Sequence, residues 1–157
     1  MPKKYSGFTL IELLVVIGIL GILLAIVLIA INPAAQFAQA NNTARTNDVN
    51  TILNAVHQYA ADHKGVLPAG ITTTAQEIKK TAGADICAVL APDYVSLFPV
   101  DPDVVGYAGA TNGAAIGDCT LDYQTGYTIV KDASGRITVT AVPESVRGVT
   151  PVISITR

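Results

Sequence analysis

The sequence predicts an α+β fold, in which a long N-terminal helix is followed by an antiparallel sheet of three or four strands. Three observations carry this prediction. Residues 8–31 form an almost unbroken apolar run, and residues 49–60 repeat their apolar positions with helical spacing. Residues 127–131 and 136–141 alternate apolar and polar side chains on either side of a turn. With 157 residues, the chain has room for one domain of ordinary size.

The apolar run is long enough to cross a membrane. As an α-helix, residues 8–31 would extend about 36 Å, which exceeds the thickness of a bilayer core. Lys3 and Lys4 precede the run, and the next basic residue is Arg45. The positive-inside rule therefore predicts a single-pass segment with its N-terminus in the cytoplasm and everything after the run exported.

One carboxylate, Glu12, interrupts the apolar run near its start. An ionised group facing hydrocarbon costs several kcal/mol unless it has a partner. One interpretation is that Glu12 lies at the headgroups and reaches water. The other is that the carboxylate meets a cation supplied by a neighbouring molecule.

The six residues from Gly7 to Glu12 read Gly-Phe-Thr-Leu-Ile-Glu, between a short basic leader and the apolar run. This pattern resembles the class III signal of type IV pilins and type II secretion pseudopilins. The resemblance implies that a prepilin peptidase removes residues 1–7, cutting between Gly7 and Phe8, and methylates the new amine of Phe8. It also implies a pilin-like lollipop, with residues 8–31 serving as the membrane anchor and then as the filament core.

The resemblance implies a role for Glu12 in assembly. After the cut, Phe8 carries an α-ammonium group that the Glu12 carboxylate of a neighbouring chain can meet, which would favour a staggered register between helices. A plain signal anchor would not need this pattern. A conventional signal peptide cleaved at the small-residue stretch 38–40 would have a shorter apolar run.

Helical periodicity continues beyond the apolar run, so residues 32–64 are predicted to extend the helix in amphipathic form. Asn32-Pro33 predicts a kink or local unwinding. Gly65 is a plausible stop after the last turn. Gly21 and Pro33 match in type the helix-loosening glycine and proline of many pilins, and Pro33 stands a few residues later than is usual there.

Residues 65–157 are predicted to form a globular head in two parts. Residues 65–119 are a connecting segment, and its stretch 90–102 resembles one common in pilins and pseudopilins. The segment is expected to contain a short helix at 74–81 opened by a capping box at Thr74 and Glu77, a second helix at 86–90 capped by Asp85, and a loop at 107–117. Residues 120–157 are predicted to form the antiparallel sheet. Its expected strands are 120–123, 127–131, 136–141 and 151–156.

Cys87 and Cys119 are the two cysteines of the chain. Their wide spacing does not suit a metal knuckle, and in an exported domain it suits one disulfide. The alternative is a reactive thiol pair.

Four aspartates, Asp101, Asp103, Asp118 and Asp122, lie on either side of the Gly-rich loop and offer oxygen ligands of the kind that Ca²⁺ prefers. Major pseudopilins bind calcium in a loop in this area, but the residues after Pro102 depart from the pattern of that loop. Solvated turn aspartates are the ordinary interpretation. We therefore predict no cofactor and keep Asp101 and Asp103 as calcium candidates.

The net charge of −2 does not point to nucleic acid, and the sequence contains no Walker, CxxC, HExxH or GxGxxG motif and no catalytic constellation. We therefore predict a structural, non-enzymatic subunit that forms a homo-oligomeric helical filament. Its expected partners are the peptidase and an assembly platform in the membrane, and its expected final location is outside the cell. A pseudopilin of a secretion system is the alternative, and a tethered binding domain that never polymerises is a third reading.

Overall fold

The computed structural model of the chain describes residues 7–106 and 112–157. Its two compact units are Met1–Phe37 and Ala38–Arg157. The expected leader, apart from Gly7, and residues 107–111 of the expected loop lie outside the described residues.

Helix α1, Leu10–Ile31, forms most of the first unit, and none of its residues is buried. Among the described residues, it is the one helix long and apolar enough to cross a membrane, judged by length and composition. The helix is regular through Gly21, so the chain's own fold shows no loosening there. The apolar surface of α1 has no partner within its own unit.

The helix breaks at Asn32, where the sequence predicts a kink or unwinding. Asn32 adopts a left-handed conformation with φ of 48°, which ends α1. Its backbone carbonyl and its side-chain oxygen both accept from the Ala35 N–H, at 3.1 and 3.4 Å. Pro33 is the first residue of the next helix, α2, Pro33–Asp62. Proline suits this position because the first N–H groups of a helix have no intrahelical acceptor.

Helix α2 ends close to the predicted position. Gly65, with φ of 87°, donates its N–H to the Ala60 carbonyl at 2.7 Å, as in a glycine-terminated helix. The predicted apolar stripe on α2 is confirmed, because Val49, Ile52, Leu53 and Val56 are fully buried.

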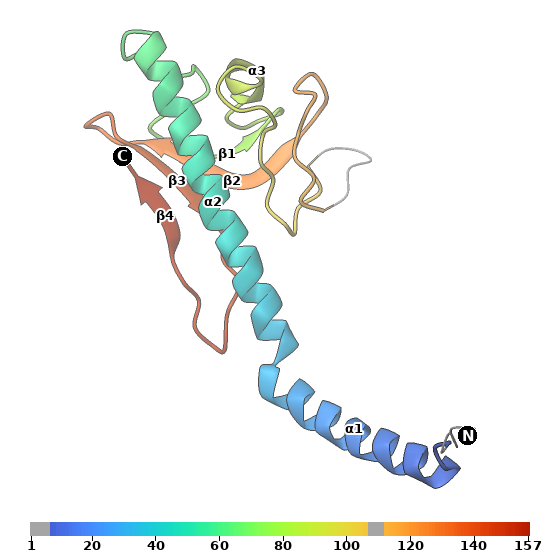
Figure 1. Cartoon of the computed structure of the whole chain (residues 1–157). Helices are drawn as coiled ribbons and strands as arrows, with labels where there is room; N and C mark the ends of the chain where they lie inside the picture. The colour runs from blue at the N-terminus through green and yellow to red at the C-terminus, as the bar shows by residue number, and fades with distance from the viewer. Residues whose placement is uncertain (1–6, 107–111) are drawn as a thin grey trace. The chain divides into compact units, whose positions relative to one another are not determined.

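In the second unit, α2 lies across one face of a four-stranded antiparallel sheet (Figure 1). The strands follow one another in the order β1-β2-β3-β4. Their bounds are β1 Gln76–Lys79, β2 Gln124–Lys131, β3 Ile137–Ala141 and β4 Ile153–Thr156. The core between helix and sheet joins the α2 stripe to inward-facing residues of the strands. These are Ile78, Tyr127, Ile129, Ile137, Val139, Ala141 and Ile153. The predicted α+β fold class is confirmed.

Two local predictions in the head are wrong. The expected helix at 74–81 is instead β1, because Ile78 is drawn into the core and Gln76 and Glu77 pair with β2. The expected strand at 120–123 is mostly turn, and β2 begins at Gln124.

The second short helix is α3, Cys87–Leu90, and it has no side-chain cap. Asp85, the expected cap, instead accepts a hydrogen bond from the Tyr123 hydroxyl at 2.7 Å. Between β2 and β3 the predicted turn is present, with Asp132 accepting from the Gly135 N–H at 3.0 Å.

Candidate functional site

The start of α1 is closed by a capping box formed by Thr9 and Glu12. The Thr9 hydroxyl oxygen accepts from the Glu12 N–H at 3.3 Å. In return, Oε2 of Glu12 accepts from the Thr9 N–H at 2.8 Å and from the Thr9 hydroxyl at 2.7 Å. Within the described part of the chain, Oε1 of Glu12 accepts no hydrogen bond. Glu12 thus caps its own helix and, among the described residues, has one carboxylate oxygen without a hydrogen-bond partner.

Gly7 and Phe8 lie just outside the helix, where the sequence predicts cleavage. Phe8 is 81% exposed. A Cβ built on Gly7 would meet nothing within 4 Å, and its backbone does not need a positive φ. The fold therefore does not require glycine at position 7, which fits a requirement set by another molecule.

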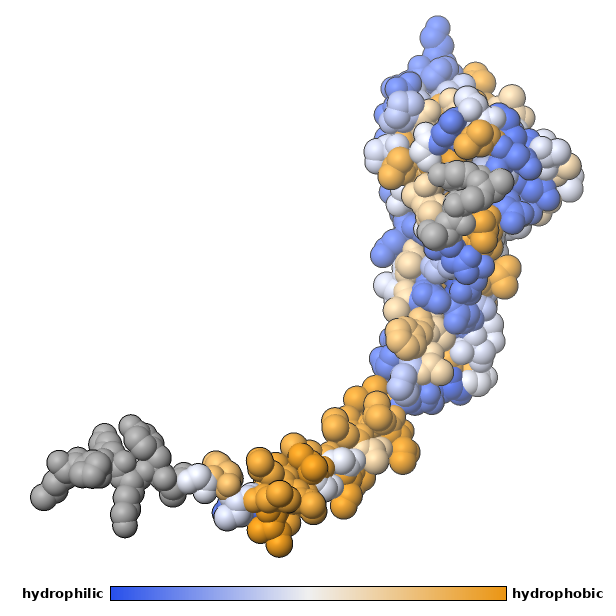
Figure 2. Space-filling model, turned by 90° about the vertical axis from the view of Figure 1, so that its right-hand side faces the viewer, coloured by the Kyte–Doolittle hydropathy of each residue, from blue (hydrophilic) through white to orange (hydrophobic). Residues whose placement is uncertain are grey.

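Beyond Glu12, α1 contains no polar side chain, and the face of the helix seen in Figure 2 is mainly hydrophobic. Gly18 and Gly21 lie within it, and neither has a neighbour within 4 Å of a built Cβ. A glycine inside a helix costs about 1 kcal/mol relative to alanine. Nothing in the chain's own packing compensates for that cost.

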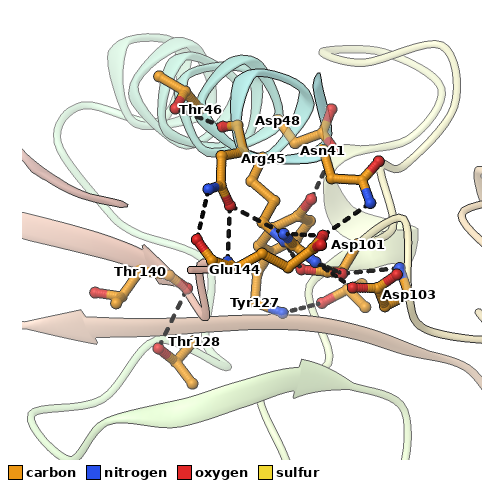
Figure 3. A network of polar contacts seen from close by, with 12 residues as sticks. Asn41, Arg45, Thr46, Asp48, Asp101, Asp103, Tyr127, Thr128, Thr140 and Glu144 are labelled. Atoms are coloured by element: carbon orange, nitrogen blue, oxygen red, sulfur yellow. Dashed lines mark hydrogen bonds and ion pairs between the residues drawn. The ribbon is translucent and has the colours of Figure 1, made fainter. Parts of the chain in front are cut away.

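The second polar centre is Arg45 of α2, whose side chain is 2% exposed. Its Nε and Nη2 donate to the two oxygens of Asp101 at 2.7 and 3.0 Å. Nη2 also donates to Asp103 at 2.6 Å, and Nη1 donates to Glu144 at 2.9 Å and to Asn42 at 3.0 Å (Figure 3). These five contacts match the five N–H donors of a guanidinium.

Asn42 and Asn41 hold the residues after β3 against α2. Asn42 accepts from the Glu144 N–H and donates to the Glu144 carbonyl, both at 2.8 Å. Asn41 donates to the Glu144 carboxylate at 2.8 Å. The segment between β3 and β4 is therefore fixed near its start, at Glu144, to Asn41 and Asn42 of α2.

The ion pairs and hydrogen bonds around Arg45 shift several titrating groups. Bonds from Asn41 and Arg45 hold the pKa of Glu144 below its usual range. The carboxylate of Asp101, followed by those of Glu144 and Asp103, raises the pKa of Arg45. Nearby, burial raises the pKa of Asp48. Burial also raises the pKa of Tyr127, and the 2.7 Å hydrogen bond from the Tyr127 hydroxyl to Asp48 raises it further.

The calcium candidates are spread over different partners. Asp101 and Asp103 bind Arg45, Asp118 accepts from the Thr120 hydroxyl, and Asp122 accepts from the Thr81 hydroxyl. In residues 7–106 and 112–157, no three acidic, histidine or cysteine side chains gather as a metal site would require.

Cys87 and Cys119 form a disulfide, with their Cα atoms 5.6 Å apart. It joins α3 to the turn that precedes β2. Tyr123 supports the same junction, because its hydroxyl accepts from the Cys87 N–H at 3.2 Å and donates to Asp85. The disulfide thus belongs to the core of the head and lies outside the N-terminal assembly segment.

Comparison with known proteins is informative for the N-terminus. Residues 2–28 match the family model of the prokaryotic N-terminal methylation motif. The chain therefore carries the class III signal of type IV pilins and pseudopilins, on an α+β fold that is consistent with a pilin-like one. The motif implies processing by prepilin peptidase and assembly into a pilus or pseudopilus. No curated protein and no solved structure matched the chain.

Replacing Arg45 by leucine should lower the free energy of unfolding by about 3–5 kcal/mol, because the buried Asp101 carboxylate would lose its counter-charge. Urea unfolding of the full chain in detergent, followed by tyrosine near-UV circular dichroism, measures the change. Arg136→Leu is the matched control. It breaks an exposed pair with Asp132 and should cost less than about 1 kcal/mol. Equal losses in the two variants would contradict the role of Arg45.

The Glu144 contacts should weaken in acid. Its folded pKa lies below the ordinary value of 4.5, so its stabilisation is complete above that pH and is lost as the pH falls through the folded pKa. Asp48, with a raised pKa, contributes in the opposite direction, gaining stability as the pH falls.

The Asp48 contribution cancels when wild type is compared with Glu144→Gln. The difference in melting temperature between them should be largest near neutral pH and should shrink once the pH is well below 4.5. Thermal unfolding at a series of pH values measures it. A difference that stays constant across the series would show that Glu144 ionisation does not stabilise the head.

Proposed function

We propose that this protein is a structural subunit of a type IV pilin-like filament, cut between Gly7 and Phe8, methylated on Phe8, and polymerised through α1. The observation that carries the proposal is Glu12. It is a carboxylate at the start of an otherwise uncharged helix in which no side chain is buried, and one of its oxygens has no hydrogen-bond partner among the described residues.

The free oxygen of Glu12 gives assembly a specific contact. Cleavage turns the backbone nitrogen of Phe8 into an ammonium group. In a bundle of apolar helices, this ammonium and the Oε1 atom of a neighbour's Glu12 each lower the cost of burying the other. The Thr9 capping bonds use Oε2, so the contact between chains can form while the cap remains. A stagger between neighbouring helices is then favoured over alignment.

The glycines of α1 support helix packing between copies. Without a hydrophobic driving force between helices in lipid, association relies on close packing, and small residues allow it. Gly18 and Gly21 offer such surfaces, and no described residue of the chain packs within 4 Å of a Cβ built at either position.

The precursor would span the cytoplasmic membrane once through α1, with its N-terminus inside, and the mature subunit would reach an extracellular filament through a membrane assembly platform. This role is structural and involves no enzymatic activity. A pseudopilin of a type II secretion system is the alternative, since it uses the same signal and ends in the cell envelope.

We also propose that the head folds without calcium, because the Arg45 guanidinium already forms ion pairs with both candidate ligands, Asp101 and Asp103. A calcium chelator should leave the urea unfolding midpoint of the full chain unchanged, and added Ca²⁺ should not raise it. A rise with calcium in the wild type that is lost in Asp103→Asn would contradict this proposal.

The test of the filament proposal is Glu12→Gln in the native cells. The variant should insert into the membrane and be cut, while sheared surface filaments fall by about tenfold or more, because the buried ammonium loses its counter-charge. Glu77→Gln, the same substitution on the head, should assemble normally.

Intact mass places the processed chain in each fraction. Wild-type chain that begins at methylated Phe8 in the sheared fraction supports a pilin, and the same chain confined to the envelope supports the pseudopilin alternative. Normal filaments from Glu12→Gln, or an uncut chain in functional wild-type cells, would refute the proposed assembly.

A further inference from the structure

A groove runs along α2 in the second unit, between the helix and the segment that joins β3 to β4. Its volume is about 580 Å³. The helix wall consists of Gln39, Asn42, Thr43, Thr46 and Asn47, and the opposite wall consists of Val146, Val149, Pro151, Val152 and Ile153. None of these ten residues is charged. The groove is therefore neutral, with one wall that is polar in composition and one that is apolar.

The helix wall is less polar than its composition suggests. The Thr43 hydroxyl donates to the Gln39 carbonyl and the Thr46 hydroxyl to the Asn42 carbonyl, both at 2.9 Å. Each hydroxyl is thus turned to its own helix backbone, as threonines in membrane helices do. The Asn42 amide is used by Glu144 and Arg45. The middle of this wall consequently has its polar atoms satisfied inside the chain.

Most of the apolar wall is exposed, and hydrogen bonds hold its first part in place. Val149 is 69% and Val152 is 89% exposed. Glu144 holds the start of this segment to α2. The Val146 N–H donates to the Val149 carbonyl at 2.8 Å, and the Val149 N–H donates to the Val146 carbonyl at 3.0 Å. A preformed wall loses little entropy when a partner binds, so its exposed valines are suited to contact with another surface.

The groove lies beside the core-facing side of α2. That side is buried along the helix, at Ala38, Asn42, Arg45, Val49 and Ile52. The groove is bordered mainly by the adjacent side of the helix, where Gln39, Thr43, Thr46 and Asn47 are exposed. An exposed strip of α2 therefore faces the apolar wall.

We propose that this groove receives helix α1 of a second copy of the chain. The inference rests on the proposed function. Beyond Glu12, α1 carries no charge, which matches the uncharged groove, and none of its side chains is buried within its own chain. Helices pack at 8–10 Å between axes when the side chains between them are small, as Thr43 and Thr46 are. In the sequence, the groove begins only eight residues beyond the end of α1.

A photo-crosslinking amino acid at Val152 identifies the occupant. Filaments are assembled in cells from isotopically light and heavy chains, and fragmentation mass spectrometry locates each crosslink. We expect light-to-heavy crosslinks from position 152 to residues 8–31. The same probe at Val66, another exposed valine (62% exposed) outside the groove, should give few crosslinks to that range. Crosslinks from position 152 only to another head, only to lipid, or to nothing would overturn the inference.

Val152→Asp supplies a second measurement, because the side chain is exposed in the subunit and its replacement should leave the fold intact. Sheared filaments should fall by about tenfold or more, since a carboxylate would be buried in a neutral contact. Val66→Asp should assemble normally. If Glu12→Gln abolishes filaments and Val152→Asp does not, the groove contact is wrong and the proposed function stands. If cut, methylated wild-type chain forms no filament, the proposed function fails, and this inference with it.

Discussion

The head depends on the burial of one charge. A guanidinium removed from water must satisfy five donors and its positive charge, and Arg45 does so with three carboxylates and one amide. These partners come from α2, from the turn at 101–103 and from the residue after Pro143. One side chain thereby connects segments that are about a hundred residues apart in sequence. The sheet supplies apolar contact with α2, and Arg45 fixes where the connecting segments lie on it.

The two helices differ in where their apolar side chains lie. From Val49 onward, α2 buries an aliphatic stripe within its own chain and exposes polar residues elsewhere. Helix α1 buries nothing, and its side chains are apolar throughout apart from Glu12. Exposed apolar surface of this extent requires lipid or other apolar helices around it. The first unit is therefore incomplete as an isolated molecule, whereas the second unit has its own core.

Sequence patterns predicted the elements whose signal is long, and they failed where the signal is four residues. The α2 stripe, the β2–β3 hairpin and the break at Asn32 follow from periodicity and backbone chemistry. The capping-box pattern illustrates the limit. At Thr74 and Glu77 it predicted a helix, but Glu77 pairs with β2 and Ile78 is buried in the core. At Thr9 and Glu12 the same pattern stands before a long helical run and forms the box. The run that follows distinguishes the two cases.

The Arg45 network was not predictable in the same way. Its partners Asp101, Asp103 and Glu144 lie 56 to 99 residues away, and no local pattern relates them. A signal was nevertheless present. Arg45 is the one lysine or arginine in α2, and it stands four residues before Val49, where the buried stripe begins. A cation on the core-facing side of a helix needs carboxylates, and the aspartates considered as calcium ligands were available for that purpose.

The network also supports the groove. Glu144 fixes the start of the segment between β3 and β4 to α2 through backbone and side-chain hydrogen bonds. The same contacts use the polar atoms of Asn42 that would otherwise hold water in the groove. The buried charge of the head thus prepares a neutral surface beside it, and a neutral helix is the kind of partner that such a surface favours.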